Sequence, residues 1–225
     1  MRKCFRIGFF LILLVLMLSG CSGRDFLATL GFDTHDYDGE PLLQTYDGES
    51  ETATELSDML KILLLDDPIL TRFSSAKEAM TSYRDAVLNY MLNQNYSKYT
   101  GNITLLDQAK EAYPQVQIAA IIPGDDFENT VYTYFGGKQK VKNETSTLFV
   151  YLDKVDAYIS VAQPQVSDIV YQIDRIEETE NTYRIYFTCI LHEQVSPTYK
   201  ALIIKREDGS CYFKYLQEYT GESAA

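Results

Sequence analysis

The sequence predicts an α+β domain in which amino-terminal helices pack on one face of a strongly curved antiparallel sheet. Three observations support this class. Helical spacing of apolar residues is found in 55–135, alternating apolar residues are found in 147–217, and the breaks between the alternating segments are short and rich in turn residues. Helices followed by a run of strands are typical of α+β proteins.

Four segments have the features of helices. Residues 55–65 carry leucines at helical spacing. A Ser-x-x-Glu capping box (Ser75 to Glu78) opens the second helix, which the polar residues 93–102 end. The third covers 105–112, and the fourth starts near Asp125 and ends at two glycines, 136 and 137. Residues 116–122 fit either a short strand or an apolar loop.

Six strands follow, separated by turn residues such as Asp208-Gly209. The predicted strands are 147–152, 155–161, 168–177, 182–192, 199–206 and 211–217. The first two form a hairpin around Asp153-Lys154. In 182–192, alternate residues from Tyr183 to Leu191 form an apolar face, and His192 lies on the opposite face.

The amino terminus has the features of a secretory signal. Basic residues at 2, 3 and 6 precede an apolar run, 7–18, of about 12 residues, which is too short for a membrane-spanning helix of about 20. The run ends in Leu18-Ser19-Gly20-Cys21, which resembles the lipobox of bacterial lipoproteins. The resemblance implies cleavage between Gly20 and Cys21 and a diacylglyceryl group on the Cys21 sulfur. An ordinary secretory signal with an incidental cysteine is the alternative.

The predicted domain organisation follows from this signal. Residues 1–20 are the signal peptide, 21–54 are the lipidated cysteine and an acidic flexible tether, 55–220 are one globular domain, and 221–225 are a tail. The resemblance places the protein on the extracytoplasmic face of a bacterial cell membrane, with a Gram-positive host favoured. An outer membrane is the alternative if the host has two membranes. Two acyl chains are sufficient for stable anchoring.

The order of helices and strands is similar to the layout of the nuclear-transport-factor-2-like and cystatin-like folds, over roughly residues 70–218. This resemblance implies a cone-shaped domain. It concerns layout alone, and such folds host enzymes, binding modules and oligomerisation domains, so it selects no function.

The composition and the motifs exclude several function classes. A net charge of −12 argues against nucleic acid as a partner, because that affinity depends on basic residues. With two histidines, one at 35 and one at 192, no His-rich metal site is expected, and no phosphate-binding loop or nucleophile elbow is present. We therefore predict no metal and no cofactor.

Few residues are candidates for catalysis. His192, next to Glu193, is the only candidate base in the globular part, and its strand parity favours a surface position. Cys189 and Cys211 could pair in an extracytoplasmic compartment. One strand lies between them in a simple meander, a separation of about 10 Å that exceeds disulfide reach, so small buried thiols are favoured over a disulfide. Several tyrosines could line a cavity or form part of the core: Tyr83, Tyr90, Tyr132, Tyr134, Tyr158, Tyr171 and Tyr186.

The sequence thus favours a non-catalytic, lipid-anchored binding or envelope-accessory domain, with a protein or peptide as its possible partner. The alternative is a small pocket enzyme that uses a carboxylate and tyrosines for proton transfer or hydrolysis. A third possibility is a structural subunit that dimerises through an open sheet face. A carboxylate beside tyrosine in a deep cavity would favour the enzyme, and a filled interior would favour the other two.

Overall fold

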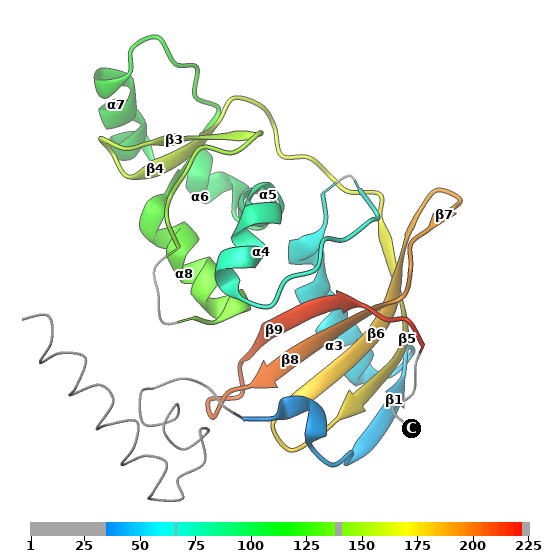
Figure 1. The fold of residues 1–225 in the computed structure, drawn as a ribbon. Helices are drawn as coiled ribbons and strands as arrows, with labels where there is room; N and C mark the ends of the chain where they lie inside the picture. The colour runs from blue at the N-terminus through cyan, green and yellow to red at the C-terminus, as the bar shows by residue number, and fades with distance from the viewer. Residues whose placement is uncertain (1–34, 66, 138–140, 222–225) are drawn as a thin grey trace, which may run out of the picture. The chain divides into compact units, whose positions relative to one another are not determined.

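The computed structural model describes residues 35–65, 67–137 and 141–221. The chain divides into two compact units, Met1–Glu40 and Pro41–Ala225. In the described part of the first unit, a single 3-10 turn, η1 (Tyr37–Gly39), is capped by Asp36, whose Oδ1 accepts a hydrogen bond from the Gly39 amide at 3.2 Å. The second unit is described below (Figure 1).

The larger sheet of the second unit is antiparallel and has six described strands. Its order is β1-β5-β6-β8-β9, and the short β7 pairs with the end of β6. The strands are β1 (Gln44–Asp47), β5 (Val170–Glu178), β6 (Thr182–Leu191), β7 (Gln194–Val195), β8 (Tyr199–Lys205) and β9 (Cys211–Glu218). The predicted meander of the last strands is therefore confirmed, and β1 is an addition at the edge.

A second, three-stranded antiparallel sheet has the order β2-β4-β3. Its strands are β2 (Ala120–Pro123), β3 (Phe149–Leu152) and β4 (Ala157–Ser160). The predicted hairpin around Asp153-Lys154 is confirmed as β3 and β4, and the ambiguous segment 116–122 contributes the start of β2. All four residues of β4 are buried, since β4 is the central strand of this sheet.

The helices are α3 (Glu51–Leu60), η2 (Lys61–Leu63), α4 (Ala76–Ser82), α5 (Arg84–Gln94), α6 (Tyr96–Thr100), α7 (Ile103–Ala112) and α8 (Gly124–Phe135). The predicted cap of α4 is present, because Ser75 Oγ accepts from the Glu78 amide at 3.2 Å. The Glu78 carboxylate, however, accepts from the amide of Ser74 at 2.8 Å instead of returning to Ser75. The end of α8 at Gly136, with φ of 63°, is also as predicted.

The second predicted helix is interrupted at Tyr83. This residue has φ of −111° and ψ of 9°, which separates α4 from α5. Its hydroxyl donates to the carbonyl of Thr71 at 2.6 Å, so the side chain is held toward the segment that precedes α4. The break between α4 and α5 therefore depends on a contact between two residues that lie 12 positions apart in the sequence.

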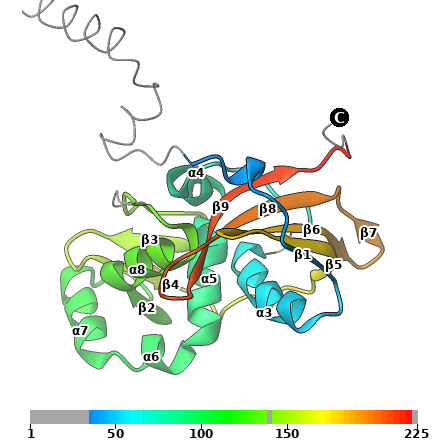
Figure 2. The same ribbon diagram turned by 90° about the horizontal axis from the view of Figure 1, so that it is seen from below.

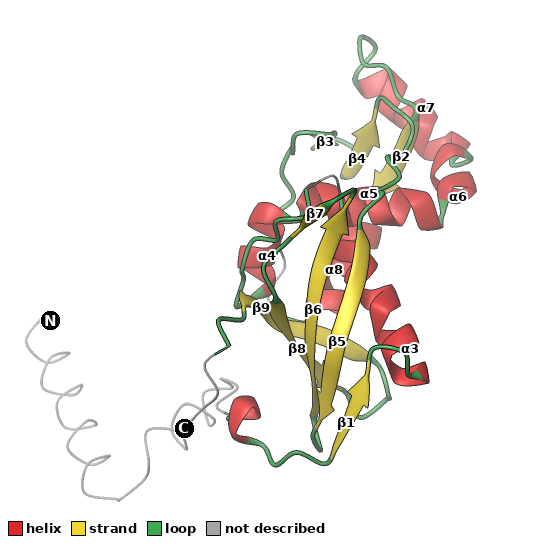
Figure 3. Ribbon diagram, turned by 90° about the vertical axis from the view of Figure 1, so that its right-hand side faces the viewer, coloured by secondary structure: helices red, strands yellow, loops and turns green. Residues whose placement is uncertain are grey.

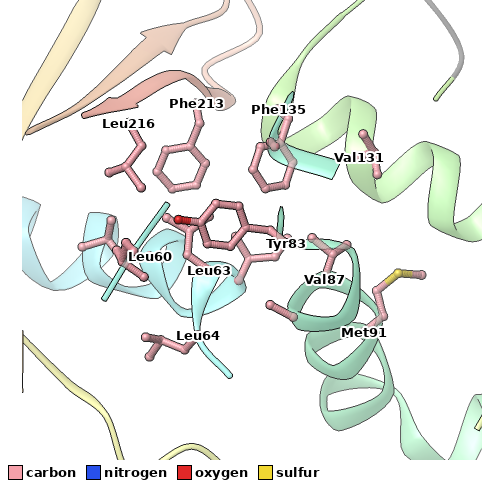
Figure 4. Close-up of a cluster of buried hydrophobic side chains, with 14 of the residues drawn as sticks. Leu60, Leu63, Leu64, Tyr83, Val87, Met91, Val131, Phe135, Phe213 and Leu216 are labelled. Atoms are coloured by element: carbon pink, nitrogen blue, oxygen red, sulfur yellow. The ribbon is translucent and has the colours of Figure 1, made fainter. Parts of the chain in front are cut away.

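The main core lies where the helices meet the inner face of the larger sheet. Figure 4 shows Phe213 and Leu216 of β9 facing Phe135 of α8 and side chains of α3, η2 and α5. Phe213 and Phe135 have ring centres 5.8 Å apart. The apolar face predicted for β6 is confirmed, since Ile185, Phe187 and Cys189 are all fully buried in this core. Figure 2 shows α3 lying along one face of the sheet.

A smaller apolar cluster joins α7 to the three-stranded sheet. It consists of Ala109, Ile121, Leu152, Ala157 and Ile159, each 2% exposed or less. This cluster fixes the carboxyl-terminal half of α7 beside the β3–β4 hairpin, which matters for the site described below.

The predicted class is confirmed at the level of α+β with antiparallel sheets, and the prediction of one strongly curved sheet is wrong. The described strands form two separate sheets, neither of them strongly curled. The division arises because residues 161–169 carry the chain from β4 of one sheet to β5 of the other (Figure 3). The assignment of 21–54 to a tether also differs from the structure, in which β1 and the first turn of α3 lie within that range.

Candidate functional site

The tyrosines of the interior form hydrogen bonds with the main chain. The hydroxyls of Tyr83 and Tyr171 donate to the carbonyls of Thr71 and Leu60, and the Tyr199 hydroxyl accepts from the Leu70 amide at 2.9 Å. Burial raises the pKa of Tyr83 and of Tyr171. The phenols of Tyr83 and Tyr199 therefore connect the core to the segment around residue 70, whereas that of Tyr171 binds the end of α3. None of these three hydrogen bonds involves a carboxylate.

The remaining candidate tyrosines are distributed over several environments. Tyr158 is fully buried against Phe127, with ring centres 4.9 Å apart. The Tyr90 and Tyr134 hydroxyls lie 3.0 Å apart between α5 and α8. Tyr132 is exposed, and Tyr186 lies on the sheet face opposite the core, stacked under Arg175 at 3.7 Å from its ring centre. These tyrosines therefore lie in different parts of the fold.

The two cysteines of the larger sheet are free, as predicted. Cys189 lies on β6 and Cys211 on β9, with β8 between them. Burial raises the pKa of the Cys189 thiol to about 12, and burial also raises that of Cys211. Neither thiol is therefore activated as a nucleophile.

His192 is exposed in the two-residue turn between β6 and β7, in agreement with the predicted surface position. Its φ of 57° is in the left-handed region, which the turn of this hairpin requires. Glu193 is exposed beside it. The turn therefore explains the backbone conformation of His192, and its exposed position gives no indication of a catalytic role.

Cys21, the predicted lipidation site, lies outside the described residues, as does the predicted cleavage position between Gly20 and Cys21. Among the helices that the structure describes, none is long and apolar enough to cross a bilayer. Within the same residues, no group of three or more His, Cys, Asp or Glu side chains could hold a metal ion.

An open groove lies between α7 and the β3–β4 turn. It has a volume of about 810 Å³ and is open to solvent. Its walls are Gln108, Glu111 and Ala112 of α7 and the turn residues Asp153, Lys154, Val155 and Asp156. Three acids and one lysine line it, so the groove is acidic.

Asp153 is held on one wall by Tyr113, the residue that follows α7. The Tyr113 hydroxyl donates to Asp153 Oδ1 and accepts from the Lys154 amide at 3.2 Å. This donation lowers the pKa of Asp153, and Asp153 in turn raises that of Tyr113. Lys154 Nζ lies 5.3 Å from the Tyr113 ring centre. Asp153 is therefore an ionised carboxylate at neutral pH.

Asp156 is held at the other end of the turn. Its Oδ1 accepts from the Tyr151 hydroxyl at 2.6 Å, and its carbonyl accepts from the Gly124 amide at the start of α8 at 2.7 Å. The hydrogen bond to Asp156 is the main cause that raises the pKa of Tyr151 to about 12. These contacts stabilise Asp156 at φ of 46°, a conformation that Asp adopts more readily than most residues.

The groove can bind cations more readily than it can transfer protons. A carboxylate has about four acceptor positions, so the one phenol bonded to each aspartate leaves capacity for a further donor. A group with a lowered pKa, such as Asp153, is a poor general acid at neutral pH. The geometry therefore suits guanidinium or ammonium groups.

Sequence reasoning did not find this groove. The signal in the sequence is the Asp-Lys-Val-Asp segment, 153–156, of the predicted hairpin, and this segment by itself predicts a turn. The packing of α7 beside the turn depends on the small apolar cluster, which no local pattern reveals.

Comparison with known proteins gives no relative on which to base a function. No protein-family model matches the chain, and no curated protein and no solved structure matches it either.

Proposed function

We propose that the protein is a lipid-anchored, extracytoplasmic, non-catalytic binding domain whose groove between α7 and the β3–β4 turn binds a basic segment of a partner. The membrane attachment is the diacylglyceryl group predicted on Cys21 of the lipobox-like segment 18–21. No nucleic acid, metal or cofactor takes part. The resemblance of the order of helices and strands to the nuclear-transport-factor-2-like and cystatin-like layout remains a prediction and carries no function.

One observation supports the binding role most directly: two carboxylates of the groove are fixed by tyrosine hydroxyls. Tyr113 binds Asp153 and Tyr151 binds Asp156, so the acids are oriented before a partner arrives. A fixed carboxylate loses less conformational freedom on binding than a free side chain does. Arginine is the favoured ligand, because its planar fork matches a carboxylate.

The alternative, a small pocket enzyme, is not favoured by the interior tyrosines. The hydroxyls of Tyr83 and Tyr171 donate their protons to main-chain carbonyls. A general acid must instead direct its proton at the reacting group of a substrate.

The groove is tested by titrating the protein with tetra-arginine and following amide shifts by NMR. Asp153→Asn combined with Glu111→Gln should weaken binding about 3- to 30-fold, since each exposed ion pair contributes roughly 0.3–1 kcal/mol. Glu55→Gln combined with Glu207→Gln is the matched control, because it removes the same charge from exposed positions elsewhere. Equal weakening in both pairs would show that net charge, and not the groove, attracts the peptide.

The anchor is tested separately by membrane fractionation in a bacterial host. Cys21→Ala should release the protein from membranes washed with carbonate. Cys4→Ala is the control, because Cys4 lies in the segment predicted to be removed. If the Cys21→Ala protein stays with the membrane, acylation at this position is wrong.

A further inference from the structure

A row of apolar side chains crosses one end of the larger sheet on the face opposite the core. Val170 of β5 pairs with Ile190 of β6, and Ile190 pairs with Val195 of β7. Directly paired residues share a sheet face, and Ile190 follows Cys189, which points into the core. Val170 and Val195 are 62% and 63% exposed. Figure 3 shows β7 beside the end of β6 where β5 begins.

A third exposed valine, Val166, lies four residues before Val170 in the segment that enters β5. Val166, 82% exposed, is the most exposed large apolar residue that the structure describes. It follows Gln165, whose carbonyl accepts from Asn89 Nδ2 at 2.8 Å and whose amide donates to Asn89 Oδ1 at 2.8 Å. Asn89 is buried in α5, so the segment is fixed in place. Val166, Val170, Ile190 and Val195 together are called the apolar ridge.

The surroundings of the apolar ridge are acidic. Residues 155–174 and 185–199 contain no lysine or arginine, whereas Asp168 is exposed just before β5 and Glu193 is exposed in the turn between β6 and β7. Asp174, in the middle of β5, is also exposed. The nearest basic residues along the strands are Arg175 and Lys200, which both pair with Tyr186. One further row of the sheet, the Gln172–Thr188 pair, lies between these residues and the ridge.

We propose that the apolar ridge is a docking surface for a partner protein segment in which apolar and basic residues alternate. Valine and isoleucine side chains supply the apolar contact, and the acidic surroundings select a basic partner. A second copy of this chain would place acidic residues opposite the acidic residues around the ridge, which would repel each other. An anionic lipid surface would be repelled for the same reason. The fixed backbone at Gln165 reduces the entropy lost on docking.

The test uses a synthetic octapeptide of alternating lysine and valine, with the full chain labelled at its Val and Ile methyl groups for NMR. Shifts are expected at Val170, Ile190 and Val195, and alternating Lys-Ser and Glu-Val octapeptides should not produce them. Val170→Thr combined with Val195→Thr keeps β-branching and should weaken binding roughly fivefold or more, because methyl groups are replaced by hydroxyls. Val150→Thr, at an exposed position of β3, is the control.

Three results would overturn the proposal. Equal shifts with the Lys-Ser peptide would show charge attraction alone, and unchanged affinity in the paired threonine variant would exclude the ridge. A concentration-dependent dimer in sedimentation velocity that the paired variant abolishes would assign the ridge to a second copy. The groove variant Asp153→Asn with Glu111→Gln should leave the ridge shifts unchanged, so failure of the groove proposal is distinguished from failure of this one.

Discussion

The amide of Gly124, the first residue of α8, donates to the carbonyl of Asp156 at 2.7 Å, and the Asp156 side chain lies directly over the Gly124 Cα. A Cβ added at Gly124 would lie 2.3 Å from Asp156 Oδ1 and 3.0 Å from the Asp156 carbonyl oxygen. A single close contact, between Gly124 and Asp156, thus joins the start of α8 to one wall of the acidic groove.

Gly124→Ala should therefore destabilise the protein by about 1–3 kcal/mol, the usual range for overpacking. Urea unfolding followed by circular dichroism measures this. Asp156→Ala in the Gly124→Ala background removes the carboxylate that the new methyl group meets. The two changes should then be non-additive, with part of the loss recovered. Simple additivity of the two free-energy changes would contradict the contact.

Arg206 is predicted to stabilise the end of α8. Its Nη2 donates to the Tyr132 carbonyl at 2.8 Å, its Nη1 donates to the Thr133 carbonyl at 3.2 Å, and its guanidinium stacks on Tyr212 at 4.6 Å. Arg206→Ala should lower the free energy of unfolding by about 1–3 kcal/mol, because a cation that caps helix carbonyls is lost. Arg206→Lys should restore only part of it, since lysine lacks the planar fork.

The control for Arg206 is Lys61→Ala, which removes an exposed cation that pairs with Asp58 one turn earlier. Surface pairs of this kind contribute roughly 0–1 kcal/mol. If Arg206→Ala lowers the free energy of unfolding no more than Lys61→Ala does, the contact of Arg206 with α8 does not stabilise the protein.

The buried tyrosines predict a loss of stability at alkaline pH. Burial raises the pKa of Tyr83 and Tyr171 in the folded protein above the ordinary value of about 10. Above pH 10 the unfolded chain loses these protons and the folded chain keeps them, so unfolding becomes easier as the pH rises. Each group should contribute up to about 1.4 kcal/mol per pH unit, with no effect below pH 10.

Urea unfolding between pH 9 and pH 12 measures this slope. Tyr83→Phe should reduce it, because phenylalanine carries no titrating hydroxyl. Stability that is independent of pH up to pH 11 would show that these phenols are not protected in the folded state.

The two free cysteines should differ in reactivity. Cys189 is fully buried with a pKa of about 12, whereas Cys211 is half-buried at the start of β9. Iodoacetamide at pH 8.5 should label Cys211 at least about tenfold faster than Cys189, because thiolate fraction and access both favour it. Peptide mass mapping gives the two rates, which should converge in urea. Similar rates in the native protein would contradict the burial of Cys189.

The elements that local patterns determine could be predicted from the sequence. The alternation in β6, the cap at Ser75 and the exit of α8 at Gly136 each depend on neighbouring residues, and each is present. The separation of Cys189 from Cys211 followed from strand order alone. Free thiols could therefore be expected before any coordinates were known.

Features that depend on contacts distant in the sequence could not be predicted. Tyr83 breaks a helix through its bond to Thr71, and β1 is held at the sheet edge by pairing with β5, more than 120 residues later. The groove needs α7 beside the β3–β4 turn, where Tyr113 reaches Asp153 across 40 residues. The hydrophobic periodicity of one segment carries no information on contacts between residues so far apart in the sequence.

The measurement that tests the account most directly is the mass of the amino-terminal tryptic peptide, Cys21–Arg24, from protein purified out of its native membrane. The account predicts that the chain begins at Cys21 and that this peptide carries a diacylglyceryl group on sulfur. A chain that begins elsewhere, or a Cys21 with an unmodified thiol, would contradict it.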